Sequence, residues 1–266
     1  MIQSNIDISS LSVKVDQPVF TAKEQECFLS IIIPLKDERD NISRLAREIQ
    51  SAMDSKPYLW ECLWVDDGSS DGTLALLRRM CAGDPRHKYI SLTQNFGQAA
   101  ALYAGFRYAR GDILATMDGD GQSDPHDIPV LVERLQHSNL HMINGIRRHR
   151  RDSLIKRASS RIANAFRNWL TRERVTDVGC ALRVFRRFCV SDIPYFHGMH
   201  RFLPTLIRTI GYDRMVETPV HHRDRWHGTT KYGINNRVWR GLVDTFVVRW
   251  MQSRMRFPEV RETWKT

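Results

Sequence analysis

The 266-residue sequence contains no uninterrupted run of about 18 apolar residues, the length that a helix needs to cross a bilayer. No basic-then-apolar segment of the secretory type begins the chain, and its five cysteines form no CxxC pair. These absences exclude zinc sites of common spacing and disulfide-rich secreted folds. We expect a cytoplasmic protein that keeps its thiols reduced and has no membrane-spanning helix.

Acidic residues are scarce beside basic ones, with 30 Asp and Glu against 40 Lys and Arg and a formal net charge of +10. Residues 146–174 hold ten basic and two acidic residues, and residues 223–256 hold eight and two. These segments carry +8 and +6, which leaves −4 for the rest of the chain. Such a positive field suits the phosphates of a nucleotide, a lipid head group or a nucleic acid. No nucleic-acid-binding motif accompanies it, so we expect no nucleic-acid partner.

Segments of strand and helix spacing alternate through the first half of the chain. Helical spacing predicts helices at 41–53, 73–82, 98–110 and after Pro125, and short apolar runs predict strands at 28–35, 58–65, 88–93, 112–117 and 141–146. This alternation is typical of an α/β protein with a mostly parallel, Rossmann-like sheet and helices on both faces. We expect a loose tail over residues 1–25, one catalytic domain over 26–233, and a C-terminal amphipathic segment over 234–266.

Two basic segments of helical spacing stand in the second half, at 154–170 and 234–255. Each combines an apolar stripe with Arg or Lys, and they contain Trp169, Trp239 and Trp250. An apolar stripe at this spacing usually packs on the core. Binding in the interfacial layer of an anionic membrane is the alternative.

The motif Asp118-Gly119-Asp120-Gly121-Gln122 follows the predicted strand at 112–117. Two carboxylates two residues apart at a strand end can share one hard cation, and Gln122 can add an amide oxygen. A bound Mg²⁺ or Mn²⁺ would neutralise charge on a departing nucleotide diphosphate. A solvated acidic turn is the alternative for an isolated motif of this kind.

Acidic residues also follow two other predicted strands. Asp66 and Asp67 open the loop after the second strand, and Asp37 and Glu38 follow the first. Ligands bind beyond the carboxyl ends of the strands in sheets of this type. Helix capping explains part of this pattern. Three acidic loops on one edge of the sheet indicate a site for a metal and a nucleotide.

These segments, in this order, resemble the family 2 glycosyltransferases, and in particular the branch of dolichol-phosphate mannose synthases and undecaprenyl-phosphate glycosyltransferases. The resemblance runs from about Leu29 to Arg254. Similar enzymes have an aromatic residue where Lys36 stands, and Asn where Asp37 stands. The matching segments are 31–34 with Glu38, 65–73, 95–102, 117–125, 176–183 and 219–232.

The resemblance implies a GT-A fold, a nucleotide-sugar donor and an Mg²⁺ or Mn²⁺ ion. It implies acceptor contacts at Gln98 and Arg201, and metal contacts at Asp118, Asp120 and Gln122. Arg225 and Lys231 belong to a loop that would close over the diphosphate. The full set of implied donor contacts is Pro34, Lys36, Glu38, Val65, Asp67, Asp118, Gly119, Asp120, Arg225 and Lys231.

Asp177 lies in a segment that faces the acceptor in similar enzymes, which makes it the candidate base or orienting group. Arg183 is expected either to contact the acceptor phosphate or to pair with Asp177 in a buried Asp–Arg pair. Asp118, beside the diphosphate, completes the expected catalytic set. A phosphate acceptor is already ionised near neutral pH, so positioning and charge neutralisation can supply most of the rate.

The resemblance therefore indicates inverting transfer of a hexose-type sugar, from GDP-mannose or a UDP-sugar, to a polyprenyl phosphate. We expect a peripheral enzyme on the inner face of the plasma membrane, held to the anionic surface by its C-terminal half. A saccharide acceptor is the alternative among enzymes. A basic protein that binds an anionic membrane or nucleic acid without catalysis is the alternative outside them.

Overall fold

The computed structural model describes residues 28–147, 154–226 and 234–255. Lys231, the predicted tail over 1–25 and the residues after 255 lie outside these ranges. Within them, no helix is both long enough and apolar enough to cross a membrane. The elements are β1 (Leu29–Leu35), α1 (Arg39–Met53), β2 (Trp60–Asp66), α2 (Thr73–Gly83), β3 (His87–Ser91), α3 (Gln98–Tyr108), β4 (Ile113–Thr116), α4 (Asp127–Gln136), β5 (Met142–Arg147), α5 (Leu154–Thr171), β6 (Arg183–Arg186), η3 (Arg187–Val190), η4 (Met199–Phe202), α6 (Leu203–Thr209), β7 (Met215–Val220) and α7 (Ile234–Arg254).

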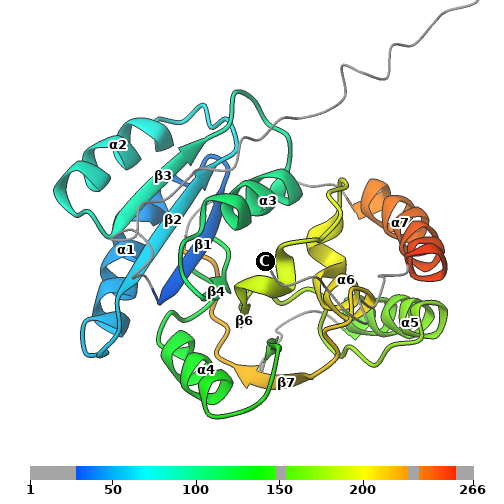
Figure 1. Cartoon of the computed structure of the whole chain (residues 1–266). Coiled ribbons are helices and arrows are strands. Elements are labelled where there is room, and N and C mark those ends of the chain that lie inside the picture. The colour runs from blue at the N-terminus through cyan, green and yellow to red at the C-terminus, as the bar shows by residue number, and fades with distance from the viewer. Residues whose placement is uncertain (1–27, 148–153, 227–233, 256–266) are drawn as a thin grey trace, which may run out of the picture.

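The strands of the described ranges form one seven-stranded sheet in the order β3-β2-β1-β4-β6-β5-β7 (Figure 1). Neighbouring strands are parallel except where β6 pairs with β4 and β5. The prediction of a mostly parallel sheet is confirmed. The sequence patterns do not predict β6 or β7, because β6 has four residues with arginine at both ends and β7 is only partly buried.

Helices cover both faces of the sheet, as predicted. Alternate residues of β1 enter two separate cores. Ile31 and Ile33 pack in the core that includes α1, α2 and α4, whereas Ile32 packs in the core that includes α3 and α6. A parallel strand buried on both faces forms a continuous apolar run in the sequence. This burial explains why β1 is recognisable from sequence alone.

The two basic helices, α5 and α7, pack against each other at the end of the molecule away from β3 (Figure 1). The rings of Phe166 and Phe246 join them, with centroids 6.3 Å apart, and Val248 of α7 is fully buried in the core. Trp250 of the same helix is 61% exposed. Only part of the apolar stripe of α7 therefore packs on the domain.

Candidate active site

The loops that follow β1, β2 and β4 meet at one edge of the sheet. The strand register pairs Pro34 with Val65 and Leu35 with Asp66, so β1 and β2 end level with each other. Asp37 accepts a hydrogen bond from Ser70 N at 2.7 Å, which joins the first two loops. The structure therefore brings the predicted donor-side residues of these loops to a common edge.

Asp118 stands at the centre of this edge, in the loop after β4. Its Oδ1 accepts a hydrogen bond from Gln98 Nε2, at the first residue of α3, at 2.8 Å. Burial, and after it the negative charge of Asp120, raise the pKa of Asp118 to about 7 against the opposing positive charges of Arg183 and Arg225. Gln98, which was expected to contact the acceptor, orients Asp118 in the structure.

Asp120 is buried and forms an ion pair with the guanidinium of Arg225. Its Oδ1 accepts a hydrogen bond from Gln122 N at 3.0 Å, and its Oδ2 lies 2.7 Å from Arg225 Nη2. The other end of the Arg225 guanidinium lies 3.6 Å from Glu38 Oε1. One arginine therefore bridges the carboxylates of the first and third loops.

The side-chain oxygens of Asp118, Asp120 and Gln122 fit a divalent cation that keeps water and substrate oxygens among its ligands. No group of three or more His, Cys, Asp or Glu side chains within the described ranges is arranged to hold a metal. Burial and the negative charge of Asp120 both raise the pKa of Asp118, and the guanidinium of Arg225 already contacts Asp120. Mg²⁺ and Mn²⁺ accept one or two carboxylates together with substrate phosphates. Asp118, Asp120 and Gln122 would hold such an ion.

Two glycines allow the loop at 118–122 to pack closely against its neighbours. A Cβ on Gly119 would lie 2.2 Å from Leu35 Cδ2, at the end of β1. Gly121 has a φ of +76°, and a Cβ there would lie 2.3 Å from the ring of Trp226. Gly119 and Gly121 are thus required by close approach, and Trp226 covers the loop.

The segment that carries Arg225 is fastened to α1 through Trp226. The guanidinium of Arg44 lies 4.0 Å from the centroid of the Trp226 ring, and that of Arg223 lies 5.0 Å away. Arg223 also forms an ion pair with Glu48 at 2.7 Å. Sequence reasoning missed Trp226 as a site residue, although it adjoins Arg225 in a matched motif.

The second acidic loop is held by its own carboxylate. Asp67 accepts hydrogen bonds from Phe96 N at 2.7 Å and Gly97 N at 2.8 Å, so it supports the turn before α3. Burial is the main cause that raises the pKa of Asp67. Lys36 Nζ donates to Gly68 O at 2.8 Å across the neighbouring loop. Contact of Asp67 or Lys36 with a donor stays a prediction.

Of the two alternatives for Arg183, the pair with Asp177 is wrong, because Asp177 pairs with a different arginine, whereas contact of Arg183 with an acceptor phosphate stays a prediction. Arg147 Nε and Nη2 lie 2.7 and 2.8 Å from the two carboxylate oxygens of Asp177. Arg183 is buried and donates to Asn144 Oδ1 at 2.9 Å and to His200 O at 3.0 Å. Arg147 was noticed in the sequence only as part of a basic segment. Its bidentate contact fixes the direction of the Asp177 carboxylate.

The remaining predicted residues are divided between the described and undescribed parts of the chain. Arg201, expected at the acceptor, forms an ion pair with Asp244 of α7 at 2.7 Å. This ion pair joins η4 to α7, and contact of Arg201 with an acceptor stays a prediction. Lys231, expected over the diphosphate, lies outside the described residues.

Comparison with known proteins places this geometry in context. The family model for glycosyl transferase family 2 matches residues 30–193. Dodecaprenyl-phosphate galacturonate synthase of Rhizobium johnstonii is 36% identical over 227 residues, which cover 84% of this chain and 67% of the relative. Undecaprenyl-phosphate 4-deoxy-4-formamido-L-arabinose transferase of Edwardsiella ictaluri is 35% identical over 209 residues, covering 78% and 63%. The chain thus spans about two thirds of the length of these relatives.

A solved structure has the same fold. Glucosyl-3-phosphoglycerate synthase from Mycobacterium tuberculosis, in complex with Mn²⁺, UDP-glucose and phosphoglyceric acid, superposes with a TM-score of 0.66 at 20% identity. The match covers 87% of this chain and 84% of that one. It confirms the predicted GT-A fold.

The raised pKa of Asp118 predicts a pH-dependent loss of stability. Its folded-state pKa of about 7 lies above the ordinary 3.8, so its contribution is fully present below pH 4 and is lost as the pH rises through 7. Without divalent cations, wild type should therefore lose stability between pH 5 and 8 relative to Asp118→Asn, as measured by urea unfolding. Mn²⁺ should restore more stability at pH 8 than at pH 5, with release of a proton in calorimetry. A constant difference between the two proteins across this range would contradict the assignment.

The Arg225–Asp120 contact predicts competition between an arginine and a metal. Arg225→Gln should bind Mn²⁺ more tightly than wild type when no nucleotide is present, because a metal then displaces no charged hydrogen bond. Such a bond is worth about 1.5–3 kcal/mol, or roughly tenfold or more in affinity. Free Mn²⁺ measured by electron paramagnetic resonance gives the constant. Arg187→Gln, which removes the arginine of an exposed ion pair with Asp112, is the control and should leave it unchanged. Weaker binding by Arg225→Gln would show that the arginine does not oppose the metal.

Proposed function

The chain belongs to glycosyl transferase family 2, and on this premise we propose that it transfers a hexose-type sugar from a nucleotide-sugar to a polyprenyl phosphate at a membrane surface. The observation that carries the proposal is the acidic edge at Asp118 and Asp120 with Arg225 lying across it. Two relatives are named for dodecaprenyl phosphate and undecaprenyl phosphate. GDP-mannose and UDP-sugars both remain candidate donors.

The acidic edge supports a mechanism of charge neutralisation at the departing diphosphate. A divalent ion held by Asp118, Asp120 and Gln122 would supply Lewis acidity at the donor phosphates. Arg225, once separated from Asp120, stands within reach of the same phosphates and offers a bidentate guanidinium. Gln98 keeps Asp118 aimed at this edge. These groups stabilise the charge that develops as the bond to the sugar breaks.

The acceptor side needs orientation more than a strong base. An acceptor phosphate is ionised near neutral pH, and its oxygen would attack the anomeric carbon opposite the leaving group, which inverts the configuration. Both carboxylate oxygens of Asp177 contact Arg147, so removal of a proton by Asp177 first requires separation of this pair. Asp177 and Arg147 are therefore better suited to hold the acceptor end of the site than to deprotonate it.

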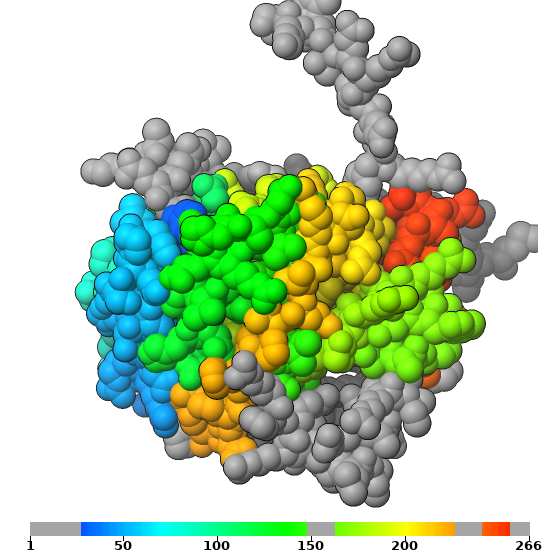
Figure 2. Space-filling model, turned by 90° about the horizontal axis from the view of Figure 1, so that it is seen from below, coloured from blue at the N-terminus to red at the C-terminus, as the bar shows by residue number. Residues whose placement is uncertain are grey.

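We also propose that α5 and α7 bring the enzyme to the membrane. Their exposed apolar side chains form a surface, here called the aromatic face, that consists of Trp169, Val243, Phe246, Val247 and Trp250. Trp169 is 74% exposed and Phe246 56%. The two helices adjoin at one end of the space-filling view, in yellow-green and red (Figure 2). Tryptophan suits the headgroup layer, and exposed Arg172 and Arg174 suit anionic lipids. This arrangement favours a peripheral enzyme on the inner face of the plasma membrane.

Transfer activity tests the proposed reaction. Wild type with Mn²⁺ or Mg²⁺ should transfer sugar to a short polyprenyl phosphate from one member of a panel of GDP- and UDP-sugars. Asp120→Asn should reduce this rate at least about 100-fold while leaving the circular dichroism spectrum unchanged, since it removes a ligand of the charge-neutralising ion. Asp112→Asn, an exposed aspartate just before β4, is the control and should retain full activity. Transfer to a saccharide instead would overturn the lipid acceptor. A lack of both transfer and donor hydrolysis would favour a non-catalytic binding protein.

Co-sedimentation with vesicles tests the membrane proposal. Full-length protein should sediment with vesicles of anionic phospholipid at low salt and be partly released at high salt, because screening weakens its electrostatic attraction. Replacing Trp169, Phe246 and Trp250 together by Ser should abolish sedimentation. The control replaces Leu59 and Val130, each 61% exposed on other elements, by Ser, and should bind as wild type does. Equal binding by the two variants would remove the aromatic face from the proposal.

A further inference from the structure

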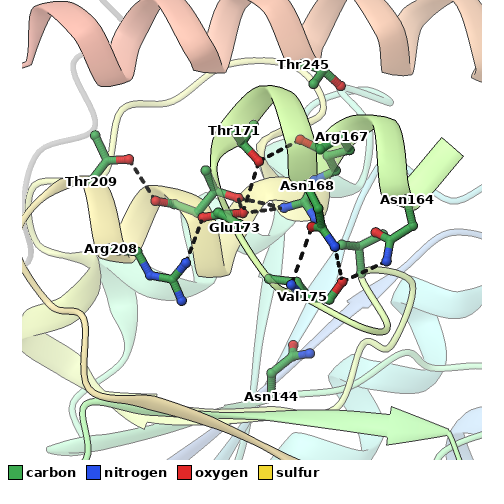
Figure 3. A network of polar contacts seen from close by, with 12 residues as sticks. Asn144, Asn164, Arg167, Asn168, Thr171, Glu173, Val175, Arg208, Thr209 and Thr245 are labelled. Carbon is green, nitrogen blue, oxygen red and sulfur yellow. Dashed lines mark hydrogen bonds and ion pairs between the residues drawn. The ribbon is translucent and has the colours of Figure 1, made fainter.

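A buried ionic cluster joins α5 to α6 just before the segment that carries Asp177 (Figure 3). The Glu173 side chain has no exposed surface, and its Oε2 accepts hydrogen bonds from Thr205 Oγ1 at 2.6 Å and Arg167 Nη2 at 3.2 Å. Arg167 Nη2 also donates to Thr205 Oγ1 at 2.6 Å, and Arg208 Nη1 lies 3.6 Å from Glu173 Oε1. None of these residues belongs to the loop at 118–122 or to the loops that follow β1 and β2.

Two asparagines of α5 form hydrogen bonds to the backbone between this cluster and Asp177. Asn164 Nδ2 and Asn168 Nδ2 donate to Val175 O at 2.7 and 2.9 Å. Asn168 O accepts a hydrogen bond from Glu173 N at 2.9 Å, and Asn164 Nδ2 reaches Thr176 O at 3.1 Å. The backbone from 173 to 176 is therefore tied to α5 along its length.

The sheet holds the same segment from its other side. Thr176 N donates to both oxygens of Glu217 on β7 at 3.0 Å, and Asn144 Nδ2 of β5 donates to Glu217 Oε1 at 3.1 Å. Asp177, the next residue, is buried and meets Arg147. A change in the position of α5 relative to the sheet must therefore act on the backbone that presents Asp177.

Helix α7 is connected to the Glu173 cluster through α5. Gln252 Nε2 of α7 donates to Thr171 O, at the last residue of α5, at 3.1 Å. Thr171 Oγ1 in turn lies 3.4 Å from Glu173 Oε2. The aromatic face consists of residues on these same two helices. A continuous set of hydrogen bonds thus connects the helices of the aromatic face to residue 177.

Stability alone does not account for a charge pair in this place. Replacing a buried ion pair by apolar residues of similar volume is often neutral or stabilising, whereas removing one partner is costly. Charged hydrogen bonds are directional, however, and those that converge on Glu173 Oε2 from Thr205 and Arg167 favour one geometry, although Arg167 Nε and Nη1 have no hydrogen-bond partner among the described residues. We propose that Glu173, with Arg167 and Asn168, is a positioning element that couples the aromatic face to the Asp177 segment. The nature of the acceptor rests on the proposed function, whereas the coupling is a property of the fold.

Matched single variants test this proposal. Glu173→Gln removes the buried charge and nearly keeps its shape. Glu61→Gln does the same at the start of β2, where Glu61 is also buried and contacts Ser30 and Arg110. Both should lower the melting temperature. Only Glu173→Gln should lower kcat/KM for the polyprenyl phosphate, by roughly tenfold or more, with the donor KM unchanged, because a small misplacement of a positioned group costs up to about 100-fold.

Hydrogen exchange tests the coupling without any activity. In wild type, anionic vesicles should slow amide exchange at 173–179, and this effect should disappear in Glu173→Gln but not in Glu61→Gln. The double variant Arg167→Met/Glu173→Met separates positioning from folding, since removal of both charges should preserve the melting temperature. It should still lose the vesicle effect and the acceptor kcat/KM. If neither of these variants folds, Asn164→Ala replaces them, because its side chain is only partly buried.

The possible outcomes are distinct. Folded variants that keep wild-type acceptor kinetics and vesicle-dependent exchange would overturn the proposal and leave the cluster a purely structural feature. Wild type that binds vesicles without slowed exchange at 173–179, or that does not bind them, would also overturn it. Slowed exchange in a protein that transfers no sugar to polyprenyl phosphate would support the coupling and reject the proposed acceptor.

Discussion

The concentration of negative charge at the ends of β1, β2 and β4 is the constraint on which the rest of the site depends. Carboxylates this close together destabilise one another unless cations or hydrogen-bond donors compensate them. Burial and the neighbouring charge of Asp120 raise the pKa of Asp118, and the contact of Arg225 with Asp120 relieves part of the repulsion. Gln98 and the close packing at Gly119 then fix the loop in place. An acidic cluster at this edge of the sheet agrees with the divalent cation that we propose for the site.

Sequence patterns predict the first half of the fold because its strands are buried on both faces and its loops carry acidic motifs next to each other. β1 is a clear case, with Ile31, Ile32 and Ile33 in a continuous apolar run. The second half is harder, since β6 begins and ends with arginine and is recognisable only when its neighbours are known. The Arg147–Asp177 pair joins residues 30 positions apart, and local spacing favours the nearer Arg183 as a partner. Tertiary packing decides such pairings, and short-range pattern contains no information about it.

Trp226 illustrates a related limit. Its ring lies against Gly121 and close to the guanidiniums of Arg44 and Arg223, so its importance follows from three segments that are distant in sequence. Aromatic residues with this combination of contacts gain energy from cation–π attraction as well as from burial. The close approach also explains why Gly121 has no side chain. A sequence motif can identify the loop and the tryptophan separately. The contact between Gly121 and the Trp226 ring explains both, and it is visible only in the folded protein.

The basic residues of the C-terminal half serve two purposes, and this division affects how the enzyme would meet a membrane. Arg147 belongs to the +8 segment, yet it compensates Asp177, an acidic residue that lies outside that segment. Arg225 likewise faces Asp120. The positive field available to a surface is therefore smaller than the charges of +8 and +6 counted for the two segments indicate. Interfacial affinity depends on buried apolar area as well as on charge. Because part of the positive charge is paired inside the protein, we expect the exposed aromatic face to contribute the larger share of the membrane affinity. Salt would then remove only the smaller, electrostatic share.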